Sequence, residues 1–128
     1  MKQPTTWNEA LAMREVKSLK ILKNHINVIK IKEMSLKEKL LYIVFEYCDN
    51  NLYEAMKEKA AKNEAYTNEQ VRDLMFQAVQ AIFYIHKNGF MHRDIKPENF
   101  LIKKQDGFKA DVILKLADFG LARGTSDR

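Results

Sequence analysis

Apolar residues recur at three- and four-residue spacings through the stretch that follows Thr67. Residues 67–70 have the form of a capping box, which places a helix start directly before this pattern. We therefore expect a long helix that Gly89 ends with a left-handed residue. Its predicted apolar face comprises Val71, Leu74, Met75, Ala78, Val79, Ile82 and His86.

A second helical pattern lies near the start of the chain. Residues 6–9 form another capping-box sequence, and a stripe at spacings of four, four and three follows at Leu11, Glu15, Leu19 and Leu22. The pattern predicts one helix from about residue 6 to residue 23. One position of the stripe is a carboxylate, Glu15, and the simplest interpretation of the pattern alone is a slightly rotated helix with Glu15 at the solvent margin.

The segments 27–34 and 40–47 are rich in Val, Ile and Tyr, and they flank a polar stretch at 35–39. This arrangement predicts an antiparallel pair of strands. The second strand, LLYIVFEY, is nearly continuously apolar, so we expect it to be covered on both faces. Asn51 follows and is suited to cap a short helix, LYEAMKEKAAK.

Three short β-type segments follow the long helix, at 90–92, 100–103 and 112–117. Residues 105–107, Gln-Asp-Gly, supply turn chemistry between the last two. The chain has no internal repeat and no low-complexity linker.

Composition and charge exclude several classes of protein. The 128 residues carry 22 basic and 17 acidic side chains, and the net charge of +5 is spread evenly, so neither nucleic acid nor a membrane surface is an expected partner. The longest apolar run, at 40–45, is far shorter than the roughly 20 residues that span a bilayer. A lone Cys48 favours a reducing compartment, and we expect the cytoplasm or the nucleus.

The sharpest local signal is the sequence HRDIKPEN at 92–99, in which Pro97 excludes a regular helix. Phosphoryl transfer requires a general base, a cation beside the phosphoryl group and oxygen ligands for Mg²⁺. Asp94, Lys96 and Asn99 supply one of each. The alternative, a charged surface turn, requires eight positions to agree by chance.

The tripeptide Asp-Phe-Gly at 118–120 is by itself also compatible with a simple turn. Its position adds weight, because Asp118 lies 24 residues after Asp94 (118 − 94), behind two short strands that a hairpin would bring back beside the first loop. Asn99 and Asp118, two groups able to bind Mg²⁺, would then converge.

With these motifs the chain resembles the eukaryotic protein kinases, whose signature includes HRD-x-K-P-x-x-N followed by DFG. Lys96 is typical of the serine/threonine form. The stretches MREVKSLK, HINVIKIKE, VFEYCDNNLYEAM, GFMHRDIKPEN and ADFGLAR are similar to the cyclin-dependent and MAP kinase branch, most closely the male germ cell-associated kinase group. The resemblance implies an α+β fold, namely a partial bilobal kinase domain over 1–128, with a small-lobe remnant at 1–47 and the hinge and start of the large lobe at 48–128.

The resemblance also implies the cofactors ATP and Mg²⁺, a protein substrate and a role for each matching residue. Asp94 would orient the substrate hydroxyl, Lys96 would lie next to the γ-phosphate, and Asn99 and Asp118 would bind magnesium. Glu15 would pair with a strand lysine that holds the other phosphates. The remaining positions implied for ATP are the hinge backbone at Glu46 and Cys48, with Phe45 guarding the pocket behind and Leu101 beneath the adenine. A stacked apolar column would comprise Leu19, Ile31, His92 and Phe119.

Some family features are absent from the 128 residues. No glycine-rich loop or V-A-I-K lysine precedes Glu15, and no A-P-E motif follows Gly120. We therefore expect the middle of a kinase domain, from a partial gene model or truncated transcript, with near-background activity and apolar faces prone to self-association. The competing hypothesis is a non-catalytic kinase remnant that binds a partner. Arg93 is the form found in kinases activated by phosphorylation, with a structural arginine as the alternative.

Overall fold

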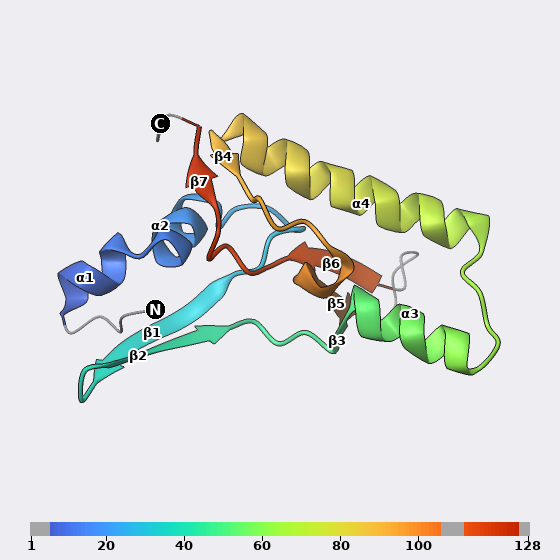
Figure 1. Cartoon of the computed structure of the whole chain (residues 1–128), viewed down its shortest axis with the longest axis horizontal. Helices are drawn as coiled ribbons and strands as arrows, with labels where there is room; N and C mark the ends of the chain where they lie inside the picture. The colour runs from blue at the N-terminus through green and yellow to red at the C-terminus, as the bar shows by residue number, and fades with distance from the viewer. Residues whose placement is uncertain (1–5, 106–111, 126–128) are drawn as a thin grey trace.

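The computed structural model describes residues 6–105 and 112–125, and Figure 1 shows how their elements are arranged. Two short helices and a two-stranded sheet form one end of the molecule, and two longer helices with a three-stranded sheet form the other. In chain order the elements are α1 Trp7–Ala12, α2 Arg14–Ile21, β1 Ile31–Lys37, β2 Leu40–Phe45, β3 Asn50–Asn51, α3 Leu52–Ala61, α4 Asn68–Lys87, β4 Phe90–Met91, the 3₁₀ turn η1 Pro97–Asn99, β5 Phe100–Lys104, β6 Val112–Leu116 and β7 Arg123–Gly124.

The single helix predicted at 6–23 is wrong, because two helices occupy this stretch. Thr6 caps α1 as predicted, accepting from the Glu9 N–H at 3.3 Å. Met13 then leaves the helical region, with φ −60° and ψ 136°, and α2 begins at the next residue. The break lets Ala10 and Val16 both be fully buried, whereas six residues on a straight helix would separate them by about 120° around the axis.

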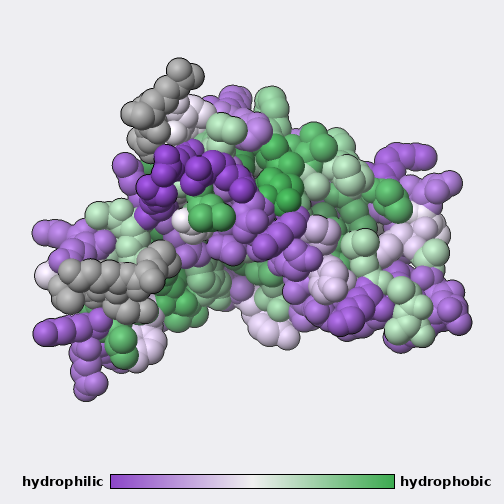
Figure 2. Space-filling model, in the orientation of Figure 1, coloured by the Kyte–Doolittle hydropathy of each residue, from purple (hydrophilic) through white to green (hydrophobic). Residues whose placement is uncertain are grey.

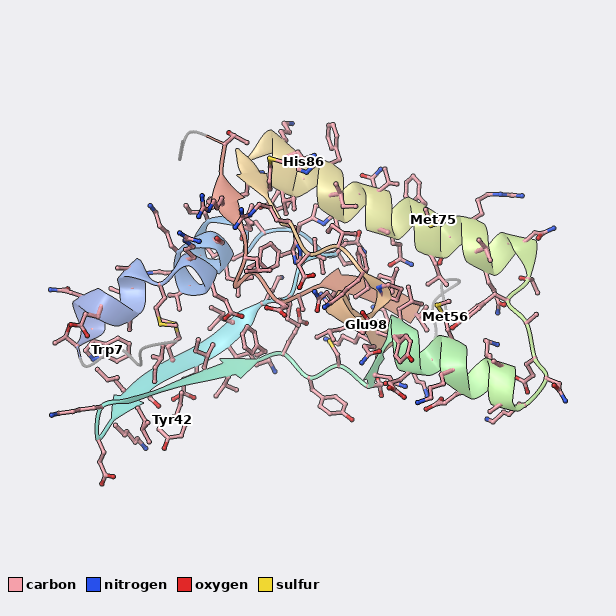
Figure 3. All side chains as sticks on the ribbon, in the orientation of Figure 1. Trp7, Tyr42, Met56, Met75, His86 and Glu98 are labelled. Carbon is pink, nitrogen blue, oxygen red and sulfur yellow. The ribbon has the colours of Figure 1, made fainter. Side chains whose placement is uncertain are left out.

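The predicted antiparallel strand pair is confirmed in β1 and β2. Glu38 and Lys39 both have positive φ, 48° and 63°, which matches the type I′ turn of a tight hairpin. Coverage of β2 on both faces is wrong, because its residues alternate and Leu40, Tyr42 and Val44 are about half exposed. Figure 3 shows Tyr42 pointing away from the sheet.

The loop before β1, residues 26–30, joins the other sheet, although residues 27–30 are predicted to begin a strand of this pair. Val28 forms a parallel bridge with Leu116 of β6, and the Ile29 N–H donates to the Leu116 carbonyl at 3.0 Å. This contact connects the two ends of the molecule directly.

The second sheet has the order β3-β5-β6 and is antiparallel throughout. Asn51 caps α3 as predicted, accepting from the Glu54 N–H at 2.9 Å. The strands predicted at 90–92, 100–103 and 112–117 correspond to β4, β5 and β6. The expected turn at 105–107 lies largely outside the described residues.

The long helix α4 has the predicted capping box, in which Thr67 and Gln70 each bond the other's backbone N–H. Gly89 follows with φ 80°, and its N–H donates to the His86 carbonyl at 3.0 Å, as expected for a left-handed end.

The buried face of α4 differs from the predicted one. It comprises Leu74, Gln77, Ala81 and Ile85, whereas the predicted Val71, Met75 and Val79 are exposed together with Phe76 and Phe83. Apolar residues surround most of this helix, so the periodic pattern does not select one stripe. Figure 2 shows the resulting apolar surface over α4.

One continuous core joins both ends of the molecule. It contains residues from α2, loop 26–30, α4, β5, β6 and the segment after β6: Leu19, Leu22, Val28, Ile29, Leu74, Ala81, Ile85, Phe100, Ile102, Leu114, Leu116, Phe119 and Ala122. Among the described helices none is long and apolar enough to cross a bilayer.

Candidate active site

Loop 92–99 is held by a buried histidine at its start. His92 is 2% exposed, its Nδ1 accepts from the Asp94 N–H at 3.1 Å, and its Nε2 lies 2.7 Å from the Ala117 carbonyl. Because Nδ1 accepts, the ring proton lies on Nε2 and is donated to Ala117. The neutral imidazole therefore bridges loop 92–99 to the residue before Asp118.

The structure brings Asp94, Lys96 and Asn99 together, as the sequence predicted. Asn99 Nδ2 donates to the backbone carbonyl of Asp94 at 2.8 Å and to its Oδ2 at 3.1 Å. Lys96 Nζ lies 3.6 Å from the other carboxylate oxygen, Oδ1. The Asp94 carboxylate is thus fixed by an amide on one side and faces a cation on the other. Figure 3 places Glu98 of the same loop next to α3.

Loop 117–120 lies directly beside loop 92–99. The Ala117 N–H donates to the Asn99 carbonyl at 2.8 Å, which complements the bond from His92 to the Ala117 carbonyl. Phe119 is fully buried and meets the His92 ring edge-on, with centroids 5.0 Å apart. Asp118 has φ 57°, and its side chain is left exposed while its neighbour points into the core.

The side chains of Asn99 and Asp118 fit a magnesium ion by the chemistry of their donors. Both donor hydrogens of Asn99 have acceptors on Asp94, which leaves the amide oxygen Oδ1 for a cation. Asp118 adds an exposed carboxylate. Mg²⁺ is commonly held by one or two carboxylates together with water and substrate phosphates, so a small protein donor set suffices.

Glu15 is half-buried on α2, and its carboxyl group is close enough to Asp118 for the two charges to interact. It therefore lies beside this site and not simply at the solvent margin. Burial raises the pKa of its carboxyl group above the usual value of 4.5, and the charge of Asp118 raises it further. In the described part of the chain no cation pairs with Glu15, so two like charges approach each other here.

The residues predicted for adenine binding lie at or beside the hinge, residues 46–49, except Leu101, which lies on β5 two residues after loop 92–99. Phe45, Cys48 and Leu101 are half-buried and pack against the core. The hinge is anchored at both ends, where the Glu46 N–H donates to the Lys30 carbonyl at 3.0 Å and the Asp49 N–H donates to the Ile102 carbonyl at 2.8 Å. Burial, followed by the Glu46 charge, raises the pKa of the Cys48 thiol, so the thiol stays protonated at neutral pH.

A cavity of about 880 Å³ lies between α3, α4 and the β5–β6 pair, and Asp49 at the end of the hinge is among the residues that line it. None of the predicted site residues lines it. Loops 92–99 and 117–120, which carry the predicted catalytic and magnesium-binding residues, therefore do not line this cavity.

Sequence reasoning missed several buried polar side chains, among them Lys115 and Gln77, which both bond distant segments. Lys115 interrupts the apolar strand β6, is 4% exposed, and its Nζ lies 3.0 Å from Glu46 Oε1. Gln77 uses both ends of its amide to bond Asn27, Asp73 and the backbone of β6. For Lys115 the sequence did contain a signal, a cation within an otherwise apolar strand. It is comparable to the Glu15 carboxylate within an apolar helical stripe.

Arg93 has φ 68°, and its Nε donates to the Leu121 carbonyl at 2.7 Å. This bond is the local carbonyl contact expected of a structural arginine. It does not exclude pairing with a phosphate, because the terminal guanidinium nitrogens are separate donors.

Comparisons of the sequence with known proteins point to one family. The family model for the protein kinase domain matches residues 1–128. Over 118 residues, 92% of this chain, the sequence is 47% identical to serine/threonine-protein kinase MAK of Mus musculus. It is 43% identical over 96% of the chain to serine/threonine-protein kinase ICK of Rattus norvegicus, and 42% identical over 94% to cyclin-dependent kinase F-3 of Oryza sativa subsp. japonica. The chain spans 17%, 18% and 25% of the length of these relatives.

Proposed function

The chain belongs to the protein kinase family, and from this premise we propose that it is part of a serine/threonine kinase that transfers the γ-phosphoryl group of ATP to protein hydroxyl groups. The observation that carries the proposal is the junction of the two loops. Through the bonds of Ala117 to Asn99 and His92, Asp94 and Asp118 belong to one rigid unit although 24 residues separate them.

Asp94 is the proposed base that orients the hydroxyl group of the substrate and accepts its proton as the new O–P bond forms. Asn99 Nδ2 holds Asp94 in place through one bond to its carboxylate and one to its backbone carbonyl. Lys96, 3.6 Å away, would stabilise negative charge on the phosphoryl group in flight.

Asn99 Oδ1 and the Asp118 carboxylate are the proposed ligands for magnesium. When bound, Mg²⁺ supplies charge neutralisation for the phosphates of ATP. The Asp118 side chain is exposed, whereas its neighbour Phe119 is buried in the core. The buried ring therefore anchors the backbone that carries the proposed magnesium ligand.

Adenine would bind at the hinge. Among the described residues none bonds the backbone N–H or carbonyl of Cys48, so both groups are available to a base. Glu46 would contribute its backbone carbonyl, Phe45 would close the pocket behind, and Leu101 would lie beneath the ring. The anchored hinge ends support this assignment, because they hold the free groups in a fixed strip of backbone.

A polypeptide with only these 128 residues is proposed to have near-background activity and weak nucleotide binding. Glu15 has no described cation partner, and the sequence holds no glycine-rich loop to cover the phosphates. Phosphoryl transfer depends almost entirely on positioning and charge stabilisation, so these missing groups matter more than the intact Asp94. Titration calorimetry with Mg-ATP tests this, and micromolar affinity would contradict it.

The family function has a more direct test. The genomic sequence upstream of Met1 should encode a glycine-rich loop and a V-A-I-K lysine, and the absence of both would contradict the catalytic proposal. In a longer product that contains them, Asp94→Asn should lower phosphoryl transfer by about 100-fold or more. Glu64→Gln, a surface change beside Lys59, is the matched control and should leave the rate unchanged.

A second candidate function, a binding or regulatory module, is favoured by the exposed apolar face of α4. Met75, Phe76, Val79 and Phe83 are each more than half exposed. A contiguous patch of this kind is typical of an interaction surface. Association of the chain with a second copy, rather than catalysis, would then be its measurable property.

A further inference from the structure

The ammonium group of Lys115 is buried although the proposed catalytic machinery does not use it. Its side chain is 5% exposed, and Nζ lies 3.0 Å from Glu46 Oε1 and donates to the Ile26 carbonyl at 2.8 Å. A buried cation is costly unless its charge and its hydrogens are matched. Here a carboxylate and a carbonyl from two distant segments provide the match.

Glu46 is held from several directions at once. Its other oxygen, Oε2, pairs with Lys103 Nζ at 3.3 Å, and Oε1 also accepts from the Lys30 N–H at 3.1 Å. Burial by itself would raise the pKa of Glu46, but the hydrogen bond and charge of Lys115, with help from Lys103 and Lys30, bring the pKa below its usual value. The pair is therefore ionised at neutral pH.

The position of this pair in the fold relates it to the hinge. Glu46 is the first hinge residue, and its backbone N–H is itself one of the two hinge anchors. Lys115 lies on β6, three residues before Asp118. A movement of the hinge away from β6 would leave a buried ammonium without its counter-ion.

We propose that Lys115 is a positioning residue for the hinge: it holds the Glu46 side chain, and through it the backbone strip at 46–48, at a fixed place relative to β6 and loop 117–120. The consequence for nucleotide binding rests on the proposed function, whereas the consequence for hinge order does not. Lys115 is not catalytic, because it reaches the hinge only through Glu46.

Lys103 provides a matched control on the same carboxylate. It pairs with Glu46 at a similar distance, but its side chain is 43% exposed against 5% for Lys115. Exposed ion pairs contribute little, whereas loss of one partner of a buried pair leaves an uncompensated charge. The two lysines carry the same charge and pair with the same carboxylate, but only Lys115 is buried. Comparison of their variants therefore separates the positioning effect from a change of net charge.

The test is amide hydrogen exchange followed by NMR on the 128-residue chain. The Glu46 and Lys30 amides report on the hinge, and the Ile85 amide in α4 reports on global unfolding. Lys115→Met should raise exchange of the hinge amides by about tenfold relative to Ile85, while Lys103→Met raises it by less than about threefold. Lys115→Arg, which keeps the charge, should retain most of the protection. Exchange that rises equally at all three amides, or not at all, would overturn the proposal.

A double variant covers the case in which Lys115→Met does not fold. Glu46→Gln with Lys115→Met removes both charges, and such neutral replacements are commonly tolerated. Relative to wild type, exchange of the amide at position 46 should still increase more than exchange of the Ile85 amide. Unchanged protection at position 46 would refute the positioning role.

Adenosine at millimolar concentration then links the hinge to ligand binding. We expect shifts of the Tyr47 and Cys48 amides, and a dissociation constant about fivefold higher in Lys115→Met. Equal affinity in wild type and variant would overturn the positioning proposal and leave the kinase proposal intact. Faster hinge exchange with no adenosine binding to either protein would support the positioning role and count against the placement of adenine at the hinge.

Discussion

Asn99 donates both hydrogens of its side-chain amide to Asp94, one to the backbone carbonyl and one to the carboxylate. The same residue accepts the Ala117 N–H on its own carbonyl. Asn99 therefore orients the proposed base and attaches loop 117–120, in addition to offering Oδ1 to a cation. Its role in stability is separable from its proposed role in metal binding.

Replacement of Asn99 by alanine should destabilise the chain even without nucleotide or metal. Two hydrogen bonds are lost, one of them to a charged group, which we expect to cost about 2 kcal/mol and to lower Tm by about 8 °C. Thermal unfolding followed by circular dichroism measures this. Asn88→Ala is the control, because it removes one exposed bond to the Tyr84 carbonyl, and an equal loss of Tm there would contradict the assignment.

Glu15→Gln should stabilise the chain at neutral pH. The folded-state pKa of Glu15 is raised by burial and by Asp118, so its ionised form is less favourable in the folded than in the unfolded chain. The penalty applies above the folded pKa and disappears as the pH falls below the unfolded value of 4.5. We expect a gain of about 0.5 kcal/mol at pH 7, small because the group is half-exposed.

Urea unfolding of the Glu15→Gln variant at pH 7 and pH 4 measures this gain. The difference from wild type should shrink at the lower pH. If the variant is less stable than wild type at pH 7, the prediction is wrong. Such a result would mean that the Glu15 carboxylate has a favourable partner outside the described residues.

Glu46→Gln should have the opposite pH dependence. The pKa of Glu46 is lowered, since the nearby lysines outweigh the opposing effect of burial, and the resulting stability is present above the unfolded value of 4.5 and lost as the pH falls through the folded pKa. We expect the variant to be less stable by about 2 kcal/mol at pH 7 and close to wild type in the acid range. Acid titration of both proteins by tryptophan fluorescence tests this, and a constant difference down to pH 2 would contradict it.

Self-association, if it occurs, should depend on α4. Phe76 and Phe83 are 63% and 64% exposed, and replacement of both by serine should shift concentration-dependent sedimentation towards the monomer. Tyr42→Ser on β2 is the comparison, because this residue is half exposed on a different element. An equal shift with Tyr42→Ser would place the contact elsewhere.

Local signals in the sequence predicted helix caps and the grouping of polar side chains within one loop. The Thr67 capping box and the Asn51 cap formed as expected, because a cap depends on residues three positions apart. The grouping of Asp94, Lys96 and Asn99 was equally predictable, since all three lie within one short loop.

The errors arose where tertiary packing decides between local alternatives. The break at Met13 lets Ala10 and Val16 both be buried, which the stripe of a single straight helix cannot encode. On α4 the interior accepts Gln77 because Asn27 and β6 satisfy its amide, so a polar residue replaced an apolar one on the buried face. The burial of Lys115 was not predicted for the same reason, because its partner Glu46 lies 69 residues earlier (115 − 46).

The attachment of loop 26–30 to β6 also has a consequence during protein synthesis. Ile26 and Lys115 are 89 positions apart, and Asn27 and Leu114 are 87 apart. At about 5–20 residues per second, the loop leaves the ribosome roughly 4–18 s before its partners are made. Throughout that interval Val28 and Ile29, almost completely buried in the finished molecule, have no strand to receive them. The nascent chain is therefore most vulnerable to chaperone capture or aggregation until β6 has been translated.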